Sequence, residues 1–146
     1  MTFKKVFALL TAIPLGLAGC AGIGPNTAYN MATTSFHYDL SYNTYMVEIN
    51  GEEIAGGGTN VASIKIGPQT VTWENARTGE LHTAKNQLII VKEQLKGKKY
   101  LALHIYPDDT VEVMTSNDLP DATAKGTALL KQQRSLRVKE AINSVN

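Results

Sequence analysis

The chain has 146 residues, with 14 basic and 13 acidic side chains and a net charge of +1. A near-neutral net charge argues against a nucleic-acid-binding protein, for which a clustered basic face is expected, so no nucleic-acid partner is predicted. Its single cysteine, Cys20, excludes a disulfide within the chain, and its length suits one domain.

The first element in the chain is a secretory signal. Lys4 and Lys5 precede an almost wholly apolar run over residues 6–18, and small residues follow it. About 13 apolar residues give roughly 20 Å of helix, which is too short to cross a hydrocarbon core of ~30 Å. A basic start, a short apolar centre and a small-residue end are typical of a signal peptide, here residues 1–19.

The sequence Leu17-Ala18-Gly19-Cys20 resembles the lipobox of bacterial lipoproteins. That resemblance implies a lipid on the Cys20 sulfur and cleavage just before it, so the expected partner of Cys20 is the lipid bilayer. Two or three acyl chains anchor a protein stably, whereas one holds it only marginally. Ala21 follows the cysteine, which by the same resemblance favours the periplasmic face of the outer membrane.

After cleavage, 12 basic and 13 acidic residues remain, and residues 20–33 are mostly small and polar and contain Gly and Pro. We expect this segment to be a flexible tether with a reach of roughly 20 Å. A β-rich domain is predicted to follow over residues 34–120.

Short runs with a period of two, or rich in β-branched and aromatic residues, indicate strands along this domain. They cover residues 34–40, 43–50, 61–66, 69–76, 80–85, 100–106 and 110–116. In 43–50, the alternation predicts Tyr45, Val47 and Ile49 on one face. Residues 86–99 are ambiguous, because 88–91 fit a buried strand whereas 91–98 fit a turn or a single helical turn. Asn50-Gly51 and residues 77–79 predict hairpin turns, and Trp73 is expected in the core.

The C-terminal segment, residues 121–146, has no strand alternation and is predicted to be helical. Asn117 or Asp118 is expected to cap the helix, with Pro120 near its first position. Gly126 weakens a helix by about 1 kcal/mol relative to Ala. Five basic residues (Lys125, Lys131, Arg134, Arg137 and Lys139) make this segment positive.

The predicted fold is therefore mainly β: an antiparallel β-sandwich or curled sheet of about six or seven hairpin-connected strands, with a C-terminal α-helix.

Catalytic, cofactor-binding and metal-binding residues are not predicted. His37, His82 and His104 each stand alone in a predicted strand, without a His or Cys two or four residues away. Two acidic pairs, Glu52-Glu53 and Asp108-Asp109, adjoin turns, where acidic residues are favoured by solvation. The lipidated Cys20 is no nucleophile. We therefore expect a protein that is not an enzyme, although a site gathered only by folding stays open.

A second resemblance concerns the hairpin "SYNTYMVEINGEEIAGGG" and the later "IGPQTVTWEN". They are similar to a group of small bacterial lipoproteins that share the positions Tyr42, Asn43, Val47, Asn50, Gly51, Gly57, Gly58, Pro68, Val71 and Trp73. Some lipoproteins of this size are immunity proteins against secreted phospholipases.

The resemblance and the absence of catalytic parts together predict a periplasmic protein-binding module, with immunity to a secreted toxin as one form of it. Loops 52–60 and 76–80 are expected to face the partner. The alternative is an envelope-maintenance lipoprotein whose basic C-terminal segment touches peptidoglycan or lipid.

Overall fold

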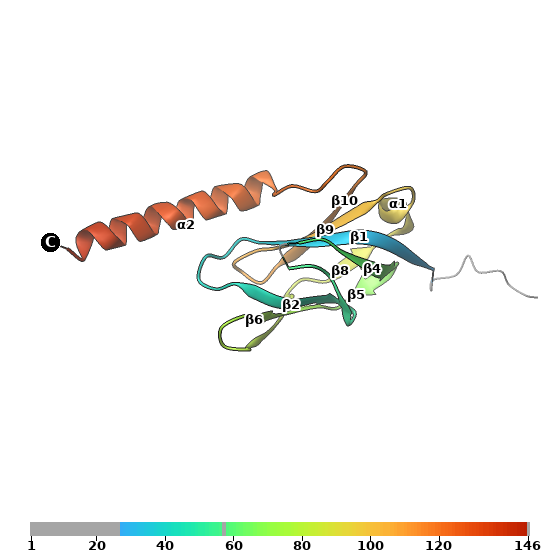
Figure 1. The fold of residues 1–146 in the computed structure, drawn as a ribbon, viewed down its shortest axis with the longest axis horizontal. Coiled ribbons are helices and arrows are strands. Elements are labelled where there is room, and N and C mark those ends of the chain that lie inside the picture. Colours follow the sequence, from blue (N-terminus) through green and yellow to red (C-terminus); the bar gives the residue numbers. More distant parts are fainter. Residues whose placement is uncertain (1–26, 57, 146) are drawn as a thin grey trace, which may run out of the picture.

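Residues 27–56 and 58–145 are described by a computed structural model, in which two packed β-sheets carry one long helix (Figure 1). The prediction of a mainly β fold with a C-terminal helix is confirmed. The predicted signal peptide and the lipidation site Cys20 lie outside the described residues.

Sheet A has the strand order β10-β9-β1-β4. Its strands are β1 (Ala28–His37), β4 (Asn60–Lys65), β9 (Tyr100–Ile105) and β10 (Val111–Ser116). β1 pairs antiparallel with β4 and parallel with β9, so the first strand lies in the middle of the sheet. The predicted hairpin of 100–106 with 110–116 is present as β9 and β10.

Sheet B is fully antiparallel and has the order β3-β2-β6-β7. Its strands are β2 (Thr44–Ile49), β3 (Glu52–Glu53), β6 (Val71–Asn75) and β7 (Leu81–Thr83). Asn50 and Gly51 both have positive φ, 53° and 77°. These two values fit the type I′ turn that Asn-Gly predicted between β2 and β3.

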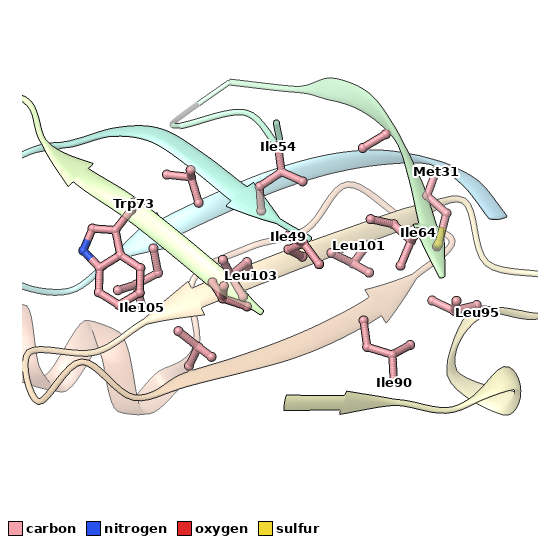
Figure 2. Packing of buried hydrophobic residues seen from close by; sticks show 14 residues of the cluster. Met31, Ile49, Ile54, Ile64, Trp73, Ile90, Leu95, Leu101, Leu103 and Ile105 are labelled. Atoms are coloured by element: carbon pink, nitrogen blue, oxygen red, sulfur yellow. The ribbon is translucent and has the colours of Figure 1, made fainter. Parts of the chain in front are cut away.

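A third, two-stranded sheet and a single helical turn complete the domain. β5 (Gly67–Gln69) pairs with β8 (Leu88–Ile90), and α1 (Lys92–Leu95) follows β8. Of the ambiguous residues 86–99, residues 88–90 therefore form a strand and residues 92–95 form a single helical turn. Ile90 and Leu95 are 1% exposed, and Figure 2 shows both directed toward the same core as the residues of the larger sheets.

The core lies between sheets A and B. β9 supplies Leu101, Leu103 and Ile105, all fully buried, and β6 supplies Trp73, also fully buried (Figure 2). The expectation that Trp73 is a core residue is confirmed. Replacing so large a buried side chain by Ala costs about 3–5 kcal/mol.

The tether predicted over residues 20–33 is wrong for its last six residues. β1 begins at Ala28, where Ala28 pairs with Lys65, and Met31 is 2% exposed in the core. This strand has small, polar inward positions at Thr33 and Ser35, which do not produce a hydrophobic alternation in the sequence. Ser35 is fixed by its hydroxyl, which donates to the Ala55 carbonyl at 2.8 Å.

Three details of the strand prediction also differ from the structure. The described residues form ten strands, several of them two or three residues long, and the β1–β9 pair is parallel. In β2 the register shifts between Tyr45 and Glu48, and Met46 has a φ of 45°. This bulge turns Tyr45 outward, where it is 59% exposed, while Val47 and Ile49 stay in the core.

The C-terminal helix, α2 (Ala124–Asn143), begins later than predicted. Its N-cap is Thr123, whose hydroxyl accepts from the Gly126 N–H at 2.9 Å, and not Asn117 or Asp118. Within the described ranges, no helix has the length and apolar character needed to span a membrane.

Candidate functional site

The most exposed part of the described chain is α2, and its attachment to sheet A begins at Tyr38. The ring of Tyr38 lies so close to Gly126 that a Cβ there would stand 2.2 Å from it. The Tyr38 hydroxyl accepts from the Thr123 N–H at 2.9 Å, directly at the N-cap of the helix. A glycine in the first turn thus lets the helix start against an aromatic ring.

One side chain of α2 continues this attachment along the loop after β1. The Gln133 amide accepts from the Leu40 N–H at 2.8 Å and donates to the Tyr38 carbonyl at 2.7 Å. Arg137 donates to the Leu40 carbonyl one helical turn further along. These bonds tie the helix to residues 38–40 and hold its direction relative to the sheet.

Tyr106 contacts the first turn of α2. Its hydroxyl donates to Glu112 and lies 3.1 Å from the Thr123 hydroxyl, and the Lys125 ammonium stands 3.8 Å from the ring centroid. Burial and the hydrogen bond to Glu112 raise the pKa of Tyr106 to about 12. The phenol therefore stays neutral and available as a cation–π partner for Lys125.

Beyond these contacts α2 extends away from the β-sheets into solvent (Figure 1). Gly126 is its only buried residue, and Leu136 and Val138 are 50% and 59% exposed. The helix carries five basic residues and one acidic residue, whereas residues 27–123 carry seven basic and twelve acidic ones. The surface of the chain therefore combines an exposed basic helix with an acidic β-domain, and either part could attract a partner of opposite charge.

The three histidines that the sequence singled out fall into two clusters. His104 lies on the outer face of sheet A beneath the start of α2, with its Nδ1 atom 2.7 Å from the Tyr38 hydroxyl. Phe36 stacks on the His104 ring with centroids 5.1 Å apart. Burial lowers the pKa of His104, and the nearby Glu112 carboxylate offsets part of that effect.

The second cluster joins the ends of sheets A and B through His37 and His82. Tyr42 lies between them, with its ring centroid 4.6 Å from that of His37 and 5.0 Å from that of His82. The Trp73 indole donates to the Tyr42 hydroxyl at 2.9 Å. His82 Nδ1 is 3.5 Å from an Asp109 carboxylate oxygen, and Lys85 lies 3.1 Å from the other oxygen.

The surroundings of His37 in this end cluster disfavour its charged form. Burial is the largest cause of the lowered pKa of His37, and the Asp39 carboxylate opposes it. Burial likewise raises the pKa of Tyr42, against the Trp73 hydrogen bond, which lowers it. The cluster thus consists of aromatic and imidazole rings in contact, which pack the ends of the two sheets together.

The acidic pairs lie where the sequence placed them, beside turns. Glu52 and Glu53 form the exposed strand β3. Asp109 occupies the turn between β9 and β10 with a φ of 61° and contacts His82 and Lys85. In residues 27–56 and 58–145, no group of three or more His, Cys, Asp or Glu side chains is placed to hold a metal ion.

The sequence did not indicate that Tyr38 and Gly126 meet. They are 88 positions apart, and Gly126 was interpreted only as a weak point of the helix. The one signal for this contact was a glycine near a helix start, which by itself also fits a loop.

The chain was compared with known proteins, and no protein-family model, curated protein sequence or solved structure matches it. The two resemblances drawn from sequence motifs therefore stay predictions.

Proposed function

We propose that this chain is a non-enzymatic lipoprotein, anchored through acylated Cys20 to the periplasmic face of the outer membrane, that binds a protein partner with an acidic surface. The observation that carries the proposal is α2, which is exposed over almost its whole length and carries a net charge of +4. A 20-residue helix reaches about 30 Å. Opposite charge would raise the rate of encounter with the partner.

The placement of the two chain ends supports this arrangement. β1 starts at one end of the β-domain, and α2 ends beyond the opposite end (Figure 1). An anchor that precedes β1 leaves α2 pointing away from the membrane, toward the periplasm. Immunity to a secreted toxin is one function that such a presented helix serves.

The partner contact is tested by a photo-reactive residue at Val138 in α2, with the same residue at Val61 in β4 as control. Both positions are exposed, at 59% and 71%. We expect one stoichiometric adduct in cells from position 138 and none from position 61. Equal adduct patterns at both positions would contradict the proposal.

The electrostatic part is tested with a matched pair of variants. Arg134→Glu/Lys139→Glu changes the charge of α2, and Lys96→Glu/Lys98→Glu makes the same change in net charge on the β-domain. Only the first variant should lose the adduct. Added salt should lower the yield of the wild-type adduct, because exposed charges are screened beyond about 8 Å at physiological ionic strength.

The anchor has its own test. A clickable palmitate analogue should label the wild-type chain and not Cys20→Ala. Label on the Cys20→Ala chain would overturn the anchor while leaving the helix contact to be judged separately.

The same exposed basic helix also supports the alternative, an envelope-maintenance role in which α2 contacts anionic peptidoglycan. In that case purified sacculi would retain the wild-type chain and release the Arg134→Glu/Lys139→Glu variant, and no protein adduct would form at position 138.

A further inference from the structure

The end of the β-domain at which β1 begins carries most of the positive charge of that domain. β1 starts at Ala28, which pairs with Lys65 at the end of β4. Four positions along β1, the Ala32 N–H donates to the Lys99 carbonyl at 3.0 Å, and α1 precedes Lys99 by a few residues. Figure 1 shows the start of β1, the end of β4 and α1 at one end of the domain, and α2 extending beyond the opposite end.

Five lysines lie at this end, which we call the lysine end: Lys65, Lys92, Lys96, Lys98 and Lys99. They are five of the seven basic residues of the segment 27–123. Only three of its twelve acidic residues, Glu52, Glu93 and Asp118, lie at or near the same end. The lysine end thus has a net charge of +2 on a domain whose net charge is −5.

The charges at the lysine end are available to a partner. Four of the five lysines are exposed, and Lys92 is half-buried. Within residues 27–56 and 58–145, none of the five ammonium groups forms an ion pair or a hydrogen bond. Two apolar side chains just before Lys92, Ile89 and Val91, are 55% and 47% exposed. Lysines with exposed apolar side chains beside them favour binding to an anionic bilayer surface.

The proposed anchor places the lysine end, and not α2, beside the membrane. Seven residues, 21–27, separate Cys20 from the start of β1, and a chain of that length spans at most about 25 Å. The exposed apolar residues Leu136 and Val138 of α2 are two positions apart, and so lie about 200° apart around the helix. α2 therefore lacks the apolar face of a helix that lies on a bilayer.

We propose that the lysine end binds the headgroups of anionic lipids in the bilayer that holds the anchor, so that α2 is directed away from the membrane. The orientation rests on the proposed anchor, whereas the affinity of the surface for anionic lipid does not. Stable anchoring takes two signals, and a polybasic surface can add to acyl chains. Each lysine near an anionic bilayer raises the affinity about fivefold.

The experiment measures binding to vesicles of phosphatidylcholine, with or without about one-third phosphatidylglycerol, by cosedimentation. The chain starts at residue 20 and carries Cys20→Ala, because the apolar run 6–18 would itself enter a bilayer; all described residues are kept. We expect a molar partition coefficient of at least ~10³ M⁻¹ for the anionic vesicles, a tenth of that of one myristoyl chain. Neutral vesicles should bind at least tenfold more weakly.

The two charge variants used for the α2 contact provide the matched pair, with the opposite expectation. Lys96→Glu/Lys98→Glu should weaken binding to anionic vesicles at least tenfold, whereas Arg134→Glu/Lys139→Glu should change it less than twofold. Circular dichroism checks that both variants keep the β fold. In cells the Lys96→Glu/Lys98→Glu chain retains its acyl anchor, so it still serves as the control for the α2 contact.

A single fluorophore reports the orientation, because the Cys20→Ala chain has no other cysteine. Lipids with a quencher at the headgroup should quench a label at Val91→Cys at least threefold more than a label at Val138→Cys. Equal quenching at the two positions, equal binding to neutral vesicles, or no binding to anionic vesicles would each overturn the proposal. So would a loss in the α2 variant as large as in the lysine-end variant, or retention on purified sacculi without binding to vesicles.

These outcomes are separate from those of the proposed function. A chain without lipid affinity at the lysine end would still take up the palmitate label at Cys20 and form the adduct at position 138. A chain without acylation would still bind anionic vesicles.

Discussion

Gly126 is required by the ring of Tyr38 and not by the conformation of the helix. In an exposed helix, replacing Gly by Ala gains about 1 kcal/mol. Here the added methyl group would stand 2.2 Å from the Tyr38 ring, inside a contact that also holds the N-cap. Sequence propensity and packing thus make opposite predictions for one residue.

We expect Gly126→Ala to lower the free energy of unfolding by roughly 1–3 kcal/mol, because overpacking outweighs the gain in helix propensity. Urea denaturation followed by circular dichroism measures this change. Ser135→Ala, on the exposed part of the same helix, is the control and should be neutral or slightly stabilising. A more stable Gly126→Ala chain would show that the ring contact is loose.

Two histidines with lowered pKa values make the stability of the chain depend on pH. The pKa values of His37 and His104 are both lowered, mainly by burial. Between the folded-state values and the unfolded value of about 6.5, the unfolded chain binds more protons, so stability falls as pH falls. The stabilisation is complete above pH ~6.5.

The free energy of unfolding should therefore decrease from pH 7 to pH 5, with a slope of at most about 1.4 kcal/mol per pH unit for each histidine, and the urea midpoint should decrease with it. His37→Gln should reduce that slope. A midpoint that increases over this range would contradict the lowered pKa values.

At the scale of elements, a bulge at one residue of β2, Met46, changes the face on which Tyr45 lies. Alternation predicted Tyr45 in line with Val47 and Ile49, and the bulge at Met46 moved Tyr45 to the surface. Within a strand, a non-glycine residue with positive φ is uncommon and persists where the surrounding structure fixes it. Here the β2–β6 pairs on both sides of the bulge hold Met46 at a φ of 45°.

Because glycine adopts this conformation freely and a β-branched residue does not, Met46→Gly should be neutral or stabilise the domain by up to about 1 kcal/mol. Met46→Val should destabilise it by about 1–2 kcal/mol. Met114→Val in β10, where the backbone is ordinary strand, is the matched control. Equal effects at the two positions in thermal denaturation would argue against strain at the bulge.

Local patterns predicted the elements better than the contacts between them. Asn50-Gly51 predicted the turn between β2 and β3, and the alternation over 100–106 predicted β9, since each pattern lies within a few consecutive residues. The start of β1 was predicted six residues late, because residues 28–33 are mostly small and polar and the buried Thr33 gives no hydrophobic alternation. The His104 cluster could not be foreseen, because its partners come from β1, β10 and the segment before α2.

At the scale of the whole molecule, the charge is divided between two parts. Residues 27–123 have a net charge of −5 and α2 has +4, although the full chain has only +1. The near-neutral composition therefore concealed a strongly polarised molecule. It is this division, and not the total, that bears on partner choice.

Two shortened chains distinguish the exposed end of α2 from the part of α2 that contacts the β-domain. A chain that ends after Val138 keeps Gln133 and Arg137 and should retain its stability within about 0.5 kcal/mol, because the residues removed are exposed. A chain that ends after Pro120 loses Thr123 and Gly126 and uncovers Tyr38, and it should lose at least about 2 kcal/mol. Equal stability of the two chains in urea would show that α2 rests on the sheet without supporting it.

The parallel pairing of β1 with β9 also has a consequence for how the chain is made. Ala32 pairs with Tyr100, 68 positions later, so β1 emerges first during synthesis and has one edge uncovered until β9 is complete. Pairings this far apart in sequence form slowly, and an open strand edge invites aggregation. The middle of β1 reads Ala-Thr-Thr-Ser, with no large apolar residue. The small polar residues that give no strand signal in the sequence also make β1 less prone to aggregate before β9 pairs with it.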